Sequence, residues 1–575
     1  MKRMMPRFAL ALCLACAFCL LCGCASREAP PPADVPQITD EPLSSAQPTP
    51  QAAPAAPAAP QGEVPSVSGN SVPAAPQGGS VQVQQGFSSG ITQDADLRIA
   101  LVAVNGVGFN PYTSNARDIN SLLKLVFESV VELDDNLQPT ALLASGWTCE
   151  DGVYLFTLRE GVRFHNGAEL TAYDVYASYE AIQIAGSFSP YFARIQYIRS
   201  MTVVDEHTLQ VEGQDCGYLT LYAMTFPVAS QLSVSSELPR GTGPYWFVAT
   251  DANGNVRLER NPIWWKKQAG LQAVAGVRYD TDAEALTALE THEVDCVATR
   301  SSTGALYRQL NDLSTIDYST LTWECLVPNL SHSILGDEAV RKAILFAIDR
   351  SSLAANAYLG LAQESEVPVI PGSFLYEPQS TQYNYNPERA LQILYEAGWQ
   401  DTNGDGVLDR IKDGLWEDLA FEITTYDEPG SSIRSEALEA VCQQLNRIGF
   451  HATCKTVSKT RMSTNLDKGD FELALIAYNL SEVPNLEFML SGRGKGNYSG
   501  SQSDRMDELL TRARSSEDES SFVSAMSDVQ MLVVSDLPVM GLFFRTGVLI
   551  SERSLGGLSG CRESQLLRGI QYVAG

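Results

Sequence analysis

Tyr154, Phe156 and Leu158 alternate with Val153, Leu155 and Thr157, and this two-residue period predicts a strand. Asn166-Gly167 comes next and predicts a tight turn, because both residue types tolerate the backbone angles that such turns need. After the turn, Thr171 and Asp174 stand three residues apart, which is the spacing of a capping box. The pattern therefore predicts a strand, a turn and the first residues of a helix.

Two further segments of the first half carry a regular pattern. Residues 97–104 predict a strand, and apolar positions at helical spacing predict a helix over 119–131. Later in the chain, Asp337 and the pair Asn386-Pro387 are typical caps at the first turn of a helix.

The last third of the chain changes repeatedly between the strand period and the helix period. Apolar residues between Ile433 and Ile448 recur at helical spacing and predict a helix between strands. The strands predicted here are 419–426, 452–457, 472–478 and 537–544, and the further helices are 504–513 and 522–534. Strands that alternate with helices in this way indicate an α/β lobe.

Composition limits the classes of function. The 575 residues are 44% hydrophobic, which is enough for two or three domain-sized cores. The formal net charge is −28, and so acidic a chain is a poor nucleic-acid binder, because phosphate contacts require clustered cations. We therefore expect no nucleic-acid partner.

The first 24 residues have the form of an export signal. Three basic residues precede an apolar stretch, 8–21, that is too short to span a membrane comfortably. The residues that follow, Leu21-Cys22-Gly23-Cys24, resemble a bacterial lipobox, which implies that Cys24 carries a lipid anchor. The alternative is an ordinary cleaved secretion signal. Residues 25–93 are rich in Pro, Ala, Gln and Ser and predict a disordered tether.

No pattern along the chain predicts a metal or phosphate site with certainty. Asp401 to Gly406 has the spacing that opens a calcium loop, but Lys412 stands where a bidentate Glu is required. We interpret this segment as a structural turn, with a weak cation site as the alternative. The five histidines form no close pair, and residues 492–496 lack the full spacing of a phosphate-binding loop.

Seven cysteines follow the leader, at positions 149, 216, 296, 325, 442, 454 and 561. Their spacing differs from that of zinc sites. Export permits disulfides, and Cys442 with Cys454 is one conceivable pair. The odd count and the scattered positions favour free thiols that are mostly buried.

Residues 141–180 also resemble a known family. They are similar to the signature region of the extracytoplasmic solute-binding proteins of family 5, the peptide/nickel-type class that supplies ABC importers. The matching positions are Leu143, Ala144, Trp147, Phe156, Leu158, Arg159, Val162, Phe164, His165, Gly167, Thr171, Ala172, Asp174 and Val175. The resemblance continues to the end of the chain through 127–134, the GTGPY motif at 241–245, 258–265, 340–350 and 537–544. One departure is His292-Glu293, where the family usually has a Gly.

The resemblance implies a fold and a function. The fold is mixed α/β, of the two-lobed type II-like kind found in periplasmic binding proteins, with an extra subdomain in the N-terminal lobe and a cleft between the lobes. The implied boundaries are 94–328 for lobe I, 329–537 for lobe II and 538–575 for a return to lobe I. The implied protein is a monomeric, extracytoplasmic binding protein without enzyme activity or cofactor. It closes around an oligopeptide or related small solute and delivers it to ABC permease and ATPase subunits.

The resemblance also implies a binding site in the cleft, where loops and aromatic walls hold the ligand. The expected residues are Phe109, Asn110, Pro111, Tyr112, the loop of Tyr191 and Phe192, Tyr478, Asn479, Leu480, Ser481, Phe543 and Phe544. Peptide-binding members usually place an Asp after the strand of Tyr478 to pair with the peptide's amino group. Ser481 occupies that position here, and Glu482 is adjacent. Peptides held without this anchor, oligosaccharides, chelated metals and other small solutes therefore stay open.

Two alternative functions are also open. A lipid-anchored sensor would present the same ligand to a receptor instead of a permease. A lipid-anchored hydrolase on the same scaffold would cleave the bound peptide or glycan. Recovery of an unchanged ligand would count against the hydrolase, and neighbouring permease and ATPase genes would favour the importer.

Overall fold

The computed structural model describes residues 91–573, apart from positions 103, 105, 216, 311, 553, 554, 556, 557 and 559. The predicted signal at 1–24, the lipidation site predicted at Cys24 and the predicted tether up to residue 90 lie outside the described residues.

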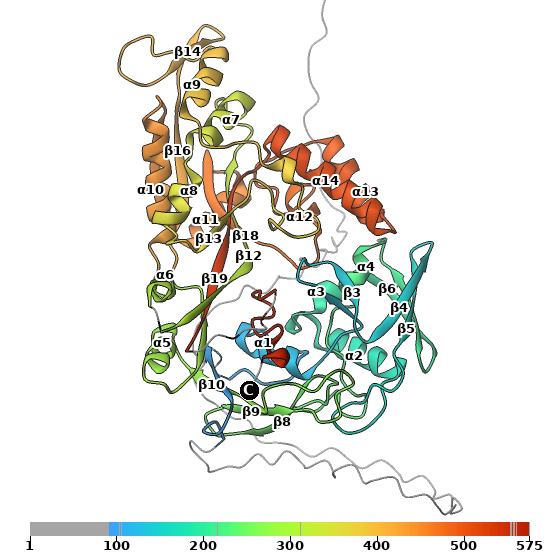
Figure 1. Cartoon of the computed structure of the whole chain (residues 1–575). Coiled ribbons are helices and arrows are strands. Elements are labelled where there is room, and N and C mark those ends of the chain that lie inside the picture. Colours follow the sequence, from blue (N-terminus) through green and yellow to red (C-terminus); the bar gives the residue numbers. More distant parts are fainter. Residues whose placement is uncertain are drawn as a thin grey trace, which may run out of the picture. The chain divides into compact units, whose positions relative to one another are not determined.

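A single sheet of eleven strands passes through both lobes of the fold (Figure 1). Its order is β17-β16-β18-β12-β19-β11-β1-β10-β9-β8, and β13 pairs with β19 beside this path. The strands are β1 Leu97–Val102, β8 Tyr245–Thr250, β9 Val256–Arg260, β10 Ala273–Tyr279, β11 Cys296–Thr299, β12 Ser314–Pro328, β13 Ala362–Glu364, β16 Ala420–Tyr426, β17 His451–Val457, β18 Leu473–Asn479 and β19 Met540–Ser551. We call the part around β8–β11 and β1 the first lobe, and the part around β16–β18 the second lobe.

Two long antiparallel strands, β12 and β19, join the lobes. The first part of β12 pairs with residues 546–551 of β19, which also pairs with β11 in the first lobe. The second part of β12 pairs with residues 540–544 of β19 and with β18 in the second lobe. The register shifts between Ser319 and Trp323, where the strands pass from one lobe to the other. Residues 540–544 of the strand predicted at 537–544 are the beginning of β19, which starts three residues later than predicted and continues to Ser551, toward the first lobe.

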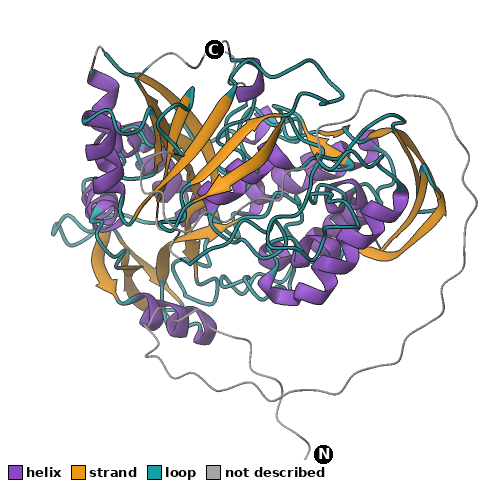
Figure 2. Ribbon diagram, turned by 90° about the horizontal axis from the view of Figure 1, so that it is seen from below, coloured by secondary structure: helices purple, strands orange, loops and turns teal. Residues whose placement is uncertain are grey.

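The first lobe also contains a separate small sheet, of order β4-β5-β7-β6, which stands at the right edge of Figures 1 and 2. The strands of this region are β2 Val131–Leu133, β3 Pro139–Ala141, β4 Ala144–Glu150, β5 Val153–Leu158, β6 Ile198–Asp205 and β7 Thr208–Gly213. The helices of the lobe are α1 Arg117–Val126, α2 Ala172–Ala185, α3 Phe192–Ile195, α4 Leu219–Ala223, α5 Asp282–Glu290 and α6 Ser302–Leu306.

The second lobe is α/β, as its pattern predicts. Parallel strands β16 and β17 are connected by helix α10, whose apolar side is buried. The helices of this lobe are α7 Glu338–Ala347, α8 Arg350–Asn356, α9 Pro387–Glu396, α10 Ile433–Asn446, α11 Lys459–Lys468, α12 Glu487–Leu490, α13 Asp504–Ser515 and α14 Glu519–Asp536. A two-stranded hairpin, β14 Asp409–Lys412 and β15 Leu415–Asp418, completes it.

The signature region folds as its pattern predicts. Strand β5 has one buried face, and the capping box of Thr171 and Asp174 starts α2. The ring of His165 is buried, and its Nε2 donates to the carbonyl of Gly243 in the GTGPY motif over 3.1 Å. The signature therefore holds two distant segments of the first lobe together.

The predicted end of the first helix is wrong. Helix α1 ends at Val126, whereas the apolar spacing predicts a helix up to residue 131. Phe127 is already extended, the Val228 amide donates to the Glu128 carbonyl, and the Val131 amide donates to the Met224 carbonyl. Backbone hydrogen bonds to residues 224–228 thus replace the last helical turn that the local apolar pattern predicts.

Two details concern residues singled out from the sequence. His292 adopts a positive φ of 61° at the turn where the family usually has Gly, so the backbone of this turn has the left-handed conformation that Gly favours.

Cys442 and Cys454 form a disulfide that connects α10 to β17. This is the disulfide that the sequence analysis names as conceivable. Among the described residues, Cys149, Cys296, Cys325 and Cys561 have free thiols.

Candidate functional site

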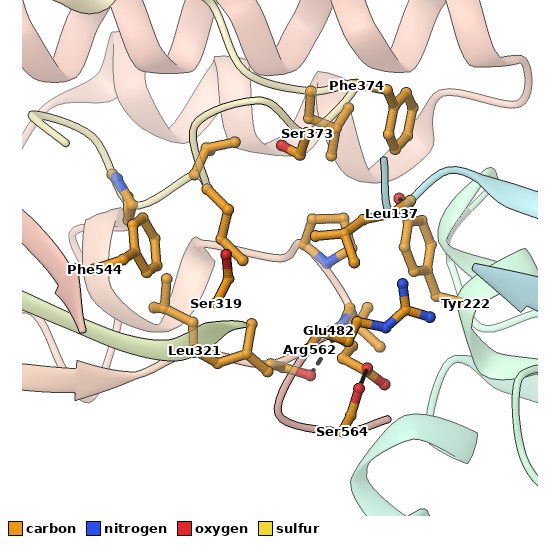
Figure 3. A pocket seen from close by; sticks show the side chains of 18 of the residues that line it. Leu137, Tyr222, Ser319, Leu321, Ser373, Phe374, Glu482, Phe544, Arg562 and Ser564 are labelled. Atoms are coloured by element: carbon orange, nitrogen blue, oxygen red, sulfur yellow. Dashed lines mark hydrogen bonds between the residues drawn. The ribbon is translucent and has the colours of Figure 1, made fainter. Parts of the chain in front are cut away.

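A cavity of about 200 Å³ lies where the two lobes and the crossing strands meet (Figure 3). We call it the apolar cavity. Ser319 and Leu321 of β12 and Phe544 of β19 form part of its wall. The remaining lining residues come from both lobes and the C-terminal segment: Asp135, Leu137, Tyr222, 368–375, 480–486, Phe488, Met526, Gly560 and 562–564. Aliphatic, aromatic and proline side chains predominate, which suits an apolar ligand group.

The carboxylates in this wall already have partners inside the protein. Nε of Arg568 donates to Asp135 over 2.8 Å, and Nη1 of Arg300 lies 2.9 Å from the Glu563 carboxylate. Glu482 is the most buried of the three carboxylates, and it also pairs internally. Each carboxylate that a ligand would meet in the apolar cavity is therefore already paired with another described residue.

Glu482 connects the second lobe to the first. It follows β18, and its carboxylate accepts from Nη2 of Arg194 over 2.7 Å and from the hydroxyl of Ser564. Burial alone raises the pKa of this carboxyl group, but the nearby cations Arg194, Arg562 and Lys124 outweigh burial and lower it to about 2. Glu482 is thus an anion that is fully engaged with the first lobe. In this arrangement it does not replace the missing amine-binding Asp.

A second, smaller cavity of about 80 Å³ lies on the other side of Glu482. We call it the polar cavity. It shares Glu482, Arg562 and Ser564 with the apolar cavity, and Figure 3 shows these three side chains together, opposite Ser373 and Phe374. Its other charged lining residues are Lys124, Glu128, Glu132, Arg194 and Lys266.

Three of the predicted site residues line the apolar cavity, namely Leu480, Ser481 and Phe544. The hydroxyl of Ser481 accepts a hydrogen bond from the amide of Val483 over 3.1 Å, which fixes the loop after β18. The structure therefore brings together the end of β18 and the crossing strand β19, as the sequence predicts.

Tyr478, Asn479 and Phe543 lie next to this wall but do not line it. The hydroxyl of Tyr478 donates to the Gly496 carbonyl over 2.7 Å, and its ring stacks between Trp323 and Tyr498. Asn479 accepts from Thr322, while the buried Phe543 ring packs against Tyr358. These side chains support the cavity from behind.

The segment of Phe109, Asn110, Pro111 and Tyr112 packs inside the first lobe, away from the lining of the apolar cavity. Phe109 packs against Phe247, the amide of Asn110 donates to the Ser236 carbonyl, and the hydroxyl of Tyr112 donates to Ser178. Pro111 is buried.

Tyr191 is adjacent to the polar cavity. The guanidinium of Arg194 lies 5.4 Å from its ring centre, and the ammonium of Lys124 lies 5.8 Å from it. Phe192 packs against the core. Tyr191 therefore supports the cations around Glu482 without lining either cavity.

The structure adds site residues that the sequence analysis does not identify. The apolar run at 368–375 forms one wall, and its Pro and Gly residues signal a loop, although nothing local indicates its partner. Leu137 and Tyr222 come from the first lobe, and Arg562 and Ser564 come from the segment after β19. Their role depends on contacts far along the chain, so no local signal identifies them.

The other candidate motifs form structural turns. The Asp401 carboxylate accepts from the amides of Gly404 and Gly406, as a turn requires. Within the described part of the chain, no cluster of three or more His, Cys, Asp or Glu side chains could hold a metal ion. Residues 491–497 fold back on α12, with the Gly496 amide donating to the Phe488 carbonyl.

Comparison with known proteins gives a consistent result. The model of the bacterial extracellular solute-binding proteins, family 5, matches residues 138–500. The oligopeptide-binding protein AppA of Bacillus subtilis is 23% identical over 489 residues, which cover 78% of this chain and 86% of AppA. The glutathione-binding protein GsiB of Salmonella typhi is 23% identical over 369 residues, covering 62% and 68% of the two chains.

Solved structures share the fold. The open, unliganded murein tripeptide-binding protein MppA superposes with a TM-score of 0.73 at 15% identity, over 84% of this chain and 97% of that one. A nickel ABC transporter protein from Bacillus halodurans gives 0.70 at 18% identity, over 82% and 98%. These likenesses confirm the two-lobed type II-like fold predicted from the sequence. Among the described residues, no helix has the length and apolar character needed to cross a membrane.

Proposed function

From the premise that this chain belongs to the bacterial extracellular solute-binding proteins, family 5, we propose that it is the lipid-anchored substrate-binding component of an ABC importer. Proteins of this family bind solutes outside the cytoplasm and are not enzymes. The ligand proposed for this chain is an oligopeptide or a related small solute, as the curated names of its relatives suggest.

The observation that carries this proposal is the position of the apolar cavity. Leu137 and Tyr222 of the first lobe lie near Phe374 of the second, and Leu321 of the crossing strand β12 lies across the cavity from them, beside Ser319 and Phe544. A ligand that touches both lobes and the strands between them binds the closed arrangement best, so binding shifts the population toward closure. The closed form would then dock on the permease as a monomer.

The proposed lobe boundaries follow the family, with lobe I at 94–328, lobe II at 329–537 and the return at 538–575. The pairing of β12 and β19 supports one passage into the second lobe and one return, and the strands themselves cross at 319–323 and 544–546. The anchor is proposed at Cys24. The variant Cys24→Ser should move the protein from the membrane fraction to the soluble fraction, and its retention in the membrane would contradict the anchor.

A direct test is mass spectrometry of small molecules that co-purify with the native protein, followed by a thermal-shift screen of peptides and other solutes. A ligand at a hundred times its Kd should stabilise the folded state by about 2.7 kcal/mol. The variant Leu480→Trp should fill the apolar cavity and abolish the shift. The control Leu232→Trp, at a side chain that is 80% exposed, should retain it. Absence of any stabilising ligand in a broad screen would contradict the proposed function.

A further inference from the structure

The polar cavity contains more positive charge than its own carboxylates neutralise. Glu482 pairs with Arg194 at 2.7 Å, and Glu132 lies 3.7 Å from Arg568. These two acids therefore have cationic partners.

The third acid in the polar cavity, Glu128, is held by neutral donors. It accepts from the indole groups of Trp264 and Trp265 and from the hydroxyl of Thr242. Burial raises the pKa of Glu128. Protonation of this group would leave still less negative charge to balance the cations.

Three cations in the same cavity form no ion pair with a carboxylate of the described residues, namely Lys124, Lys266 and Arg562. The ammonium of Lys266 lies 4.8 Å from the centre of the Trp265 ring, and its charge lowers the pKa of Glu128, against the effect of burial. The ammonium of Lys124, at the end of α1, has no hydrogen-bond or ion-pair partner within the described part of the chain, although it lies near the Tyr191 ring. Arg562 donates only to the carbonyls of Asp134 and Leu133 and to the amide oxygen of Gln565, and its Nε is buried without a partner among the described residues.

This imbalance is costly in a buried place. Burial lowers the pKa of Lys124 to about 8, and Arg194 and Arg562 contribute to that shift, although Glu482 and Glu132 oppose it. Burial also lowers the pKa of Arg562. A bound anion would relieve both effects, because an opposite charge at short range favours the protonated form of each base.

We propose that the ligand carries a carboxylate, which is bound between Lys124 and Arg562, while its apolar body occupies the apolar cavity. This inference rests on the proposed function and names its substrate class: peptides recognised by a free carboxyl end and not by the amino end. Arg562 lines both cavities and therefore stands where such a ligand would pass from one to the other. Glu482 is already paired with Arg194, so its carboxylate is not available to anchor the amino end of the ligand.

The first test compares three mixtures of tripeptides composed of Leu, Val and Phe, with free ends, with N-acetylated ends or with C-terminally amidated ends. We expect the free and acetylated peptides to bind equally and the amidated peptides about ten- to a hundredfold more weakly, as the loss of a charge-assisted contact predicts. The variant Lys124→Met should lose the preference for the free carboxylate, Lys124→Arg should retain it, and the exposed Lys495→Met is the matched control. Equal binding of the amidated peptides would overturn the inference and leave the proposed function intact.

The second test does not depend on peptide binding. Lysines are labelled by reductive ¹³C-methylation, the Lys124 signal is assigned by its loss in Lys124→Arg, and its titration is followed by NMR. Isovalerate should raise the titration midpoint, whereas the neutral isovaleramide should not. If the Lys124 titration midpoint is the same with isovalerate as with isovaleramide, the proposed carboxylate site is wrong. If isovalerate raises the midpoint but none of the three peptide mixtures binds, only the proposed peptide function is contradicted.

Discussion

Arg194 of α3 and Glu482, which follows β18, form an ion pair between the lobes, with Nη2 and Oε2 2.7 Å apart. Both side chains are largely buried, and the pair lies between the apolar and the polar cavity. Ser481, the position at which the family resemblance leads us to expect an amine anchor, is thus next to a contact that the protein makes with itself.

Replacing Glu482 with Gln should destabilise the protein by about 3 kcal/mol, because it leaves Arg194 buried beside other cations without a carboxylate partner, although Arg194 still donates to the Thr225 hydroxyl. Urea unfolding at neutral pH would measure this change. The control is Glu487→Gln, which breaks a more exposed pair with Arg514 and should cost less than about 1 kcal/mol. Equal losses in the two variants would contradict the role of Glu482.

The contribution of Glu482 to the free energy of unfolding should also depend on pH. Its pKa is lowered to about 2 in the folded protein, so its stabilisation is complete above the ordinary carboxyl pKa and is lost as the pH falls through about 2. Unfolding measured from pH 5 downward should show a steeper acid loss in the native protein than in Glu482→Gln. Identical acid profiles would show that Glu482 is not responsible.

His165 should give the protein a pH dependence in a milder range. Burial lowers its pKa from 6.5 to about 4, so the unfolded chain binds a proton between these values while the folded protein does not. Stability is therefore complete above pH 6.5 and falls by about 3 kcal/mol as the pH drops toward 4. Urea midpoints across this range should decline less in His165→Gln than in the native protein. The exposed His451→Gln is the control and should leave the decline unchanged.

Tyr478 should behave as a core residue. Its side chain is 6% exposed and stacks on two aromatic rings, so Tyr478→Ala should cost about 3–5 kcal/mol of folding free energy. Tyr478→Phe keeps the packing and removes only the hydrogen bond to Gly496, for a loss of about 1 kcal/mol. Chemical denaturation of the two variants tests this order. A stable Tyr478→Ala with weakened ligand binding would instead indicate a direct contact with the ligand.

The Cys442–Cys454 disulfide should stabilise the second lobe. It closes a loop with a sequence separation of 12 residues, for which loop-closure entropy predicts about 3 kcal/mol. Reduction with dithiothreitol should lower the denaturation midpoint of the native protein. The double variant Cys442→Ser with Cys454→Ser should start at the lower value and show no response to reductant.

Much of the fold can be predicted where local signals agree with tertiary contacts. The capping box of Thr171 and Asp174 and the β16-α10-β17 unit are examples, because caps and periodicity act within a few residues. The end of α1 could not be predicted, because hydrogen bonds from residues about a hundred positions later decide it.

The candidate site is predictable only in part, for the same reason. Leu480 and Ser481 follow the end of β18 and Phe544 lies within β19, in segments that the family resemblance identifies. The pairing of Glu482 with Arg194 joins residues 288 positions apart, and Arg562 follows the last strand without any motif. The charge balance of the polar cavity is therefore visible only in the folded protein.

The paired crossing strands have one more consequence. The chain enters the second lobe on β12 and leaves it on the adjacent β19, where Cys325 faces Gly541 and Leu326 faces Met540. The second lobe is thus an insertion in the chain of the first lobe, and its first and last residues, Trp323 and Phe544, are paired on neighbouring strands roughly 5 Å apart. We expect that residues 323–544 can be removed, circularly permuted or exchanged between relatives without stretching the chain at either junction.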